Sequence, residues 1–147
     1  MSEQSNHGTI LLVEDSPDDV ELTLRAFKKG HLSNPIIVKR DGREALDYLL
    51  GTDDAGEPNL LPVVVLLDLN MPRVNGLQVL QKMRSHEYTR IVPVVVLTTS
   101  DEQRDVIDSY HLGANSFVRK PVESKEFFEA ILSLELYWTV RNVPPPL

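Results

Sequence analysis

The chain has 147 residues, of which 41% are hydrophobic and 25% are charged, which is the size and composition of one globular domain with a buried core. Its net charge of −7 argues against nucleic-acid binding, which needs clustered Lys and Arg, and the absence of cysteine excludes disulfides, thiol catalysis and thiolate metal sites. The longest apolar runs, 63–67 and 92–97, are too short to span a bilayer, and residues 1–8 lack the hydrophobic stretch of a signal peptide. We therefore expect a cytoplasmic protein with no membrane partner.

Strand-like and helix-like segments alternate through the first half of the chain. The predicted elements are a strand at 9–13, a helix from Ser16 to Gly30, a strand at 35–38, a helix from Asp41 or Gly42 to Gly51, and a polar loop at 52–62. Ser16 followed by Pro17 is typical of a helix start, because serine caps free backbone N–H groups and proline fits the first turn. In this first helix Val20, Leu24 and Phe27 recur at helical spacing and are predicted to face the core.

The same alternation continues through the second half. The predicted elements are a strand at 63–67, a helix at 75–85, a strand at 93–97, a helix from Ser100 to about Leu112, a strand at 116–118 and a helix at 122–138. Ser100 with Gln103 forms a capping-box pattern, and Gly113 is predicted to end that helix.

Five βα units with all-apolar strands predict a parallel sheet with helices on both faces. The simplest topology is a doubly wound, flavodoxin-like α/β sheet of five strands in the order 2-1-3-4-5. We expect a flexible N-terminal segment at 1–8, one domain at 9–138 and a C-terminal extension at 139–147.

Side chains that can do chemistry follow four of the predicted strands. Glu14 and Asp15 follow the first strand, Asp68 the third and Thr98 the fourth, and Lys120 comes shortly after the fifth. Sites in open α/β sheets form outside the carboxyl ends of the strands, so these side chains are expected at one edge of the sheet. A single acid after a strand is usually a turn or cap residue, but this combination at four strand ends indicates a functional site.

The three acids predict a magnesium site. Two bare carboxylates about 4 Å apart repel by about 4 kcal/mol at an effective dielectric near 20, so the cluster needs a cation or shared protons. Oxygen ligands without His or Cys suit Mg²⁺, and we expect Asp15, Asp68 and a backbone carbonyl near Asn70 to hold it, with Glu14 acting through water.

With Mg²⁺ in place, Asp68 can act as a nucleophile towards a phosphoryl group and form an acyl phosphate. Lys120 would supply a second positive charge, and the Thr98 hydroxyl would donate a hydrogen bond to a phosphoryl oxygen. An inward move of Thr98 would leave space for Phe117, although Phe117 fits a plain core role equally well.

These residues resemble the response regulator receiver family of two-component signalling. The resemblance covers about residues 8 to 138, and it is carried by Val13-Glu14-Asp15, by Asp68-Leu69-Asn70-Met71-Pro72 with Gly76, by Leu97-Thr98 and by Lys120-Pro121. The spacing of these motifs also agrees with the family. As a set they are specific, whereas each alone is weak.

The resemblance implies a role for each matching residue. Asp68 would be the phosphoacceptor of a partner histidine kinase or phosphotransfer protein, and Thr98 and Phe117 the switch residues. Glu14 and Asp15 would be the acidic metal pair, and Lys120 the phosphate-binding ammonium. Asn70 and Ser100 would tune the lifetime of the acyl phosphate, and a helix cap is an equal alternative for Ser100.

The chain also resembles stand-alone receivers, and in particular the small regulators paired with phytochromes. The Glu-Asp-Ser-Pro-Asp-Asp opening after the first strand, the long 52–62 loop and Tyr137-Trp138 carry this narrower resemblance. It implies a phytochrome-type kinase, a downstream phosphotransfer or effector protein, and a protein that is not a turnover enzyme. The aromatic pair also predicts a homodimer through the last helix and the C-terminal extension.

Two other functions share parts of this pattern. A Mg²⁺-dependent phosphatase would also use Asp68 as its nucleophile. Phosphatases with this chemistry resemble a pattern that has a second acid two residues after the nucleophile, and Asn70 stands at that position here. A flavin carrier shares the fold, but Glu14 and Asp15 would repel its phosphate.

Overall fold

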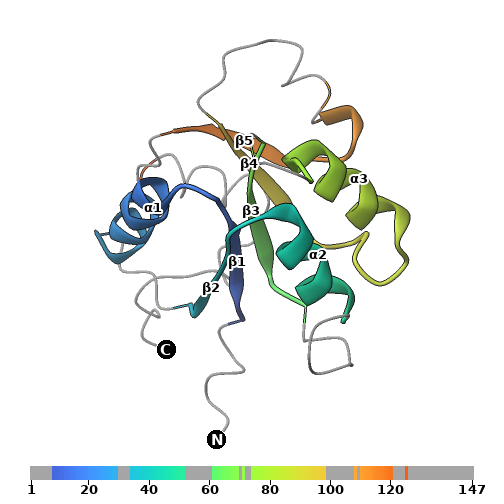
Figure 1. Ribbon diagram of the computed structural model, residues 1–147, viewed down its shortest axis with the longest axis horizontal. Coiled ribbons are helices and arrows are strands. Elements are labelled where there is room, and N and C mark those ends of the chain that lie inside the picture. The colour runs from blue at the N-terminus through green and yellow to red at the C-terminus, as the bar shows by residue number, and fades with distance from the viewer. Residues whose placement is uncertain are drawn as a thin grey trace, which may run out of the picture.

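Five parallel strands form one sheet in the order β2-β1-β3-β4-β5 (Figure 1). The computed structural model describes residues 8–29, 34–51, 61–69, 71, 74–98, 108, 110–120 and 125, without the side chains of Thr98 and Arg119. The strands are β1 (Ile10–Val13), β2 (Ile36–Lys39), β3 (Val64–Asp68), β4 (Val94–Thr98) and β5 (Ser116–Arg119), and the helices are α1 (Pro17–Lys29), α2 (Gly42–Leu50) and α3 (Gly76–Ser85). The predicted fold class and strand order are confirmed.

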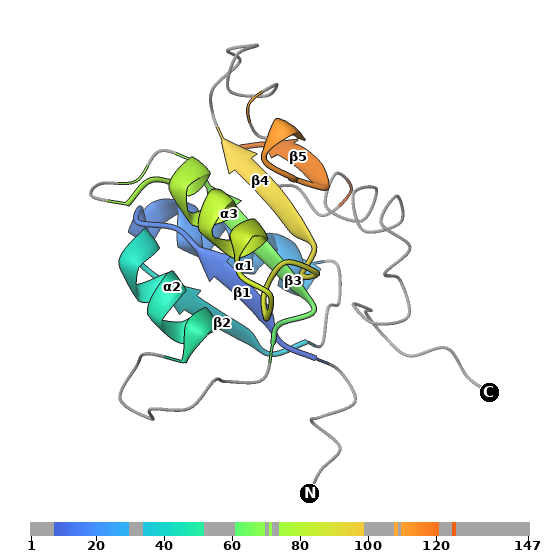
Figure 2. The same ribbon diagram turned by 90° about the vertical axis from the view of Figure 1, so that its right-hand side faces the viewer.

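Helices lie on both faces of the sheet, with α1 on one side and α2 and α3 on the other (Figures 1 and 2). Alternate residues of each strand supply the two layers of the core, because successive side chains of a strand point to opposite faces. The layer beneath α1 contains Ile10, Leu12, Val64, Leu66, Val95, Leu97 and Val118. The layer beneath α2 and α3 contains Leu11, Val13, Val65, Leu67, Val94 and Val96.

The predicted inward face of α1 is wrong in one position. Leu24 is 37% exposed, and the buried residues of α1 are Thr23, Ala26 and Phe27. A helix turns about 100° per residue, so a buried stripe centred on Thr23 turns the next residue away from the core. The N-terminal cap is as predicted, with the Asp19 backbone N–H donating to Ser16 Oγ over 3.3 Å.

Local sequence signals fix both ends of α2 and the start of α3. Asp41 caps α2 by accepting a hydrogen bond from the Glu44 backbone N–H, and Gly51 ends it in the left-handed conformation at φ 78°. Asn75 and Gln78 form a reciprocal capping box at the start of α3. This second capping box was not among the sequence predictions.

Several predictions fall on residues outside the described part of the chain. These are the capping pattern at Ser100 and Gln103, most of the helix at 122–138, the aromatic pair Tyr137-Trp138 and the extension at 139–147. The domain bounds and the homodimer therefore stay predictions. Among the described residues, no helix is both long enough and apolar enough to cross a membrane.

Candidate functional site

The side chains of Glu14, Asp68 and Lys120 meet at the carboxyl edge of the sheet, on the side covered by α1. Each continues the alternation of its strand: the residue two positions earlier, in β1, β3 or β5, belongs to the core layer beneath α1. Asp68 is the last residue of β3, one position later than the predicted strand end. The neighbouring strands β1 and β3, and β5 on the far side of β4, thus carry their polar ends to one place.

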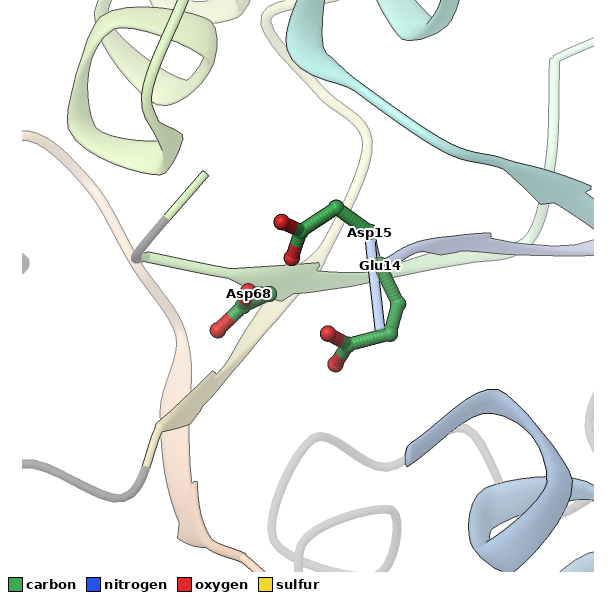
Figure 3. A group of neighbouring side chains, drawn as sticks. All are labelled: Glu14, Asp15 and Asp68. Carbon is green, nitrogen blue, oxygen red and sulfur yellow. The ribbon is translucent and has the colours of Figure 1, made fainter. Parts of the chain in front are cut away.

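Three carboxylates share this edge. One oxygen from each of Glu14, Asp15 and Asp68 lies within 4.8 Å of the others. Glu14 is fully buried, Asp68 is 3% exposed and Asp15 is half-buried. Figure 3 shows the two acids that follow β1 and the acid at the end of β3 facing a common space. The acids that the sequence places at separate strand ends are therefore one cluster.

Lys120 lies among these acids. Its Nζ is 2.6 Å from Glu14 Oε1 and 3.2 Å from Asp68 Oδ1, and it donates a hydrogen bond to Asp19 Oδ2 over 3.0 Å. Only 7% of the Lys120 side chain is exposed. The predicted ammonium is therefore directed into the acid cluster and is the counter-ion of the buried acids. We call Lys120 and the carboxylates around it the acidic pocket.

The pocket holds more negative than positive charge. Among the described residues, the ammonium of Lys120 contacts three carboxylates, those of Glu14, Asp19 and Asp68. A fourth carboxylate, that of Asp15, clusters with Glu14 and Asp68. The pKa of the Glu14 carboxyl is raised from 4.5 to about 7, chiefly by burial; the Lys120 ammonium opposes this rise and the Asp68 carboxylate contributes to it. Burial by itself would lower the pKa of Lys120, but the neighbouring carboxylates outweigh it and raise that pKa. The lysine stays charged, and the surplus negative charge remains on the acids.

Two close backbone contacts shape the loop after β3. A Cβ at Gly76 would overlap the Asp68 carbonyl oxygen, and one at Gly42 would overlap the Val74 carbonyl oxygen. The Gly76 N–H donates to the Leu69 carbonyl over 3.1 Å, which draws the start of α3 against the end of β3. Only glycine permits these approaches, so both residues fix the backbone next to Asp68.

The remaining predicted site residues are described less completely. The backbone of Thr98 ends β4 one position beyond Leu97, which pairs with Asp68 across the sheet. Phe117 is half-buried and packs against the core layer beneath α2 and α3. Asn70 and Ser100 lie outside the described residues. Their roles remain predictions.

Asp19 is a site residue that the sequence analysis missed. It is the third residue of α1, and its carboxylate is 30% exposed where it contacts Lys120. Asp18 and Asp19 both fit the usual preference for acids in a first helical turn, and the sequence does not distinguish them. The rotation of α1 on the sheet turns Asp19 towards Lys120 and leaves Asp18 exposed.

Known proteins resemble this chain along most of its length. The model of the family described as "Response regulator receiver domain" matches residues 10–132. Response regulator Rcp1 of Synechocystis sp. is 37% identical over 139 residues, which cover 94% of each chain. The structure of the bacteriophytochrome response regulator RtBRR is 52% identical, with a TM-score of 0.82, and the similarity covers 95% of this chain and 84% of that one. The structure of the Mn²⁺-bound form of response regulator Rcp1 is 35% identical, with a TM-score of 0.73 and coverage of 95% and 99%.

Proposed function

Because this chain belongs to the response regulator receiver domain family, we propose that Asp68 accepts a phosphoryl group from a partner histidine kinase. The resulting conformational change is passed on by protein–protein contact or by phosphorelay. The observation that carries this proposal is the pocket itself, in which Asp68 lies 3.2 Å from the Lys120 ammonium and beside two further acids. The match to the receiver family gives no support to the phosphatase alternative.

In the transfer step an Asp68 carboxylate oxygen attacks the phosphorus of a phosphohistidine. A new oxygen–phosphorus bond forms, the phosphorus–nitrogen bond breaks, and its electron pair stays on the imidazole nitrogen that leaves. Lys120 stabilises the charge on the transferred oxygens, because its ammonium is already within 3.2 Å of Asp68 and is nearly shielded from water.

The acid cluster fits a divalent cation, since three oxygen donors lie within 4.8 Å of one another and the surplus charge of the pocket is negative. We propose Mg²⁺, held by Asp15 and Asp68 with Glu14 close by, because these donors are all hard oxygens. The backbone carbonyl of Asn70 would complete the set. When bound, the ion neutralises charge on the transferring phosphoryl group.

Thr98 and Phe117 are the proposed switch residues. The position of Thr98 at the end of β4, next to the strand that carries Asp68, suits a hydroxyl that hydrogen-bonds the phosphoryl group. Phe117 belongs to β5 and packs against the core layer beneath α2 and α3, where a rotamer change would alter that face of the domain.

The partner kinase that we propose is of the phytochrome type, as the similarity to RtBRR and Rcp1 suggests. The output would be a phosphotransfer or effector protein, and the domain would signal without turning over a substrate. A homodimer through the last helix and residues 139–147 remains part of this proposal. Sedimentation with and without a phosphoryl mimic tests it, and a monomer in both states at tens of micromolar would contradict it.

Labelling with acetyl phosphate and Mg²⁺ tests the central step. We expect one base-labile phosphoryl adduct per chain, located on Asp68 by mass spectrometry, and its loss in Asp68→Asn. Asp18→Asn is the matched control, since Asp18 is exposed and outside the pocket. An unlabelled wild-type protein or an adduct on another residue would refute the proposal, and repeated turnover of an aryl phosphate would indicate a phosphatase instead.

A further inference from the structure

Lys120 has one more acidic partner than the transfer step uses. We propose that Asp19 is a positioning residue: it holds the Lys120 ammonium in the unphosphorylated domain and competes with the phosphoryl group for it. This inference rests on the proposed phosphorylation of Asp68. It assigns a role to an α1 residue that acts on the site through the lysine.

Three carboxylates compete for the ammonium of Lys120. Asp19 accepts a hydrogen bond over 3.0 Å, while oxygens of Glu14 and Asp68 lie 2.6 and 3.2 Å from Nζ. An ammonium has only three N–H donors, so a new acceptor competes with these three oxygens for them. A phosphoryl group on Asp68 brings three strong acceptors and additional negative charge to this position.

Asp19 is the partner that is easiest to displace. Its side chain is 30% exposed, against 0% for Glu14 and 4% for Asp68, so water can replace the lysine at Asp19 at the lowest desolvation cost. Glu14 is also held through its other oxygen, which accepts the Ser16 backbone N–H over 3.2 Å. Phosphorylation therefore turns Lys120 away from Asp19 and towards Asp68.

This exchange would connect the site to α1. In the unphosphorylated domain, Lys120 just after β5 is tied to the first turn of α1 through Asp19. When the ammonium turns to the phosphoryl group, that tie is lost and the Asp19 carboxylate is hydrated. Asp19 thus lowers the affinity of the pocket for a phosphoryl group and makes the first turn of α1 sensitive to the occupancy of Asp68.

Beryllium fluoride, which mimics a phosphoryl group on a carboxylate, provides the test. Its affinity is measured by ¹⁹F NMR titration of the full chain at saturating Mg²⁺, for the wild type, Asp19→Asn, Asp19→Glu and Asp18→Asn. We expect Asp19→Asn to bind about fivefold more tightly than the wild type, the effect of removing one partly exposed ion-pair partner. Asp19→Glu restores the charge and is expected to bind nearly as the wild type does.

The control Asp18→Asn removes the same charge from the same helical turn without contacting Lys120, so it isolates the contact from the general loss of charge. The affinity for Mg²⁺ alone is expected not to rise in Asp19→Asn. This measurement separates the proposed role from a general loosening of the pocket, which would not favour the anion over the cation. Equal beryllium fluoride affinities in Asp19→Asn and Asp18→Asn, with a wild type that binds normally, would overturn the role of Asp19 and leave the proposed function intact. A wild type that binds no beryllium fluoride would overturn both.

Discussion

Replacing Lys120 with methionine removes the ammonium from the acidic pocket while keeping much of the length of the side chain. Three carboxylates lie within 3.2 Å of Nζ, and two of them, those of Glu14 and Asp68, are almost completely buried. Without the ammonium these two acids lose the cation that lies 2.6 Å and 3.2 Å from their oxygens. The folded state must then either hold uncompensated buried charge or take up protons.

The expected loss of stability depends on pH and on the metal ion. Removing one member of a buried ion pair costs about 3–5 kcal/mol, and we expect a loss in this range at pH 8 without divalent ions. The loss is expected to be smaller at pH 5, because the pKa of Glu14 is already about 7 and this carboxyl is protonated there. Saturating Mg²⁺ supplies the missing positive charge, so it is expected to stabilise the variant more than the wild type.

Urea unfolding followed by circular dichroism measures these differences at pH 5 and pH 8, each with EDTA and with Mg²⁺. Lys82→Met is the control, because Lys82 is exposed at the end of α3 and its loss is expected to cost less than about 1 kcal/mol. If Lys120→Met behaved like the control at pH 8 in EDTA, or if its deficit were the same at both pH values, the ammonium would not be balancing buried carboxylates and the electrostatic reasoning would be refuted.

Three other variants test separate parts of the structure. The pKa of Glu14 is raised, so its contribution to stability is full below pH 4.5 and is lost as the pH rises through about 7. Over this interval the free energy of unfolding of the metal-free wild type is expected to fall by up to about 3 kcal/mol, and that of Glu14→Gln by much less, in urea unfolding. Gly76→Ala forces a Cβ against the Asp68 carbonyl oxygen and is expected to cost about 1–3 kcal/mol and to slow acetyl phosphate labelling; unchanged values of both would contradict the close approach. Arg84 donates hydrogen bonds to the carbonyls of residues 90, 92 and 113 and to the side chain of Asn115. Arg84→Lys loses the planar guanidinium fork and is expected to lower stability by about 2–3 kcal/mol in thermal or urea unfolding. A loss under about 0.5 kcal/mol would show that the fork is dispensable.

The two core layers and the place of the site follow from local patterns in the sequence. All-apolar runs such as 63–67 are typical of strands that are buried on both faces, and five strands joined by helices leave a parallel sheet as the simplest arrangement. The polar residues Glu14, Asp68 and Lys120 stand at the ends of these runs. Period-two alternation then places all three on one face, so their meeting was predictable from the sequence.

The rotation of α1 was not predictable in the same way. Val20, Leu24 and Phe27 fit one helical stripe and Thr23, Ala26 and Phe27 fit another, and the first has the more apolar residues. The structure buries the second, because packing depends on how α1 fits the sheet surface and not on hydrophobicity alone.

The sequence by itself predicted the strand order, as the simplest topology for five βα units. It also predicted the acid cluster and its ammonium, because these residues stand at the ends of strands. Only the tertiary structure decided which acid of the first turn of α1 reaches Lys120. Asp19 and Lys120 are 101 positions apart, and they meet over 3.0 Å because α1 packs on the sheet in one rotational setting. Arg84 is a second case, since its acceptors come from two loops that only the fold brings together. No local pattern encodes such contacts, because they depend on the packing of whole elements.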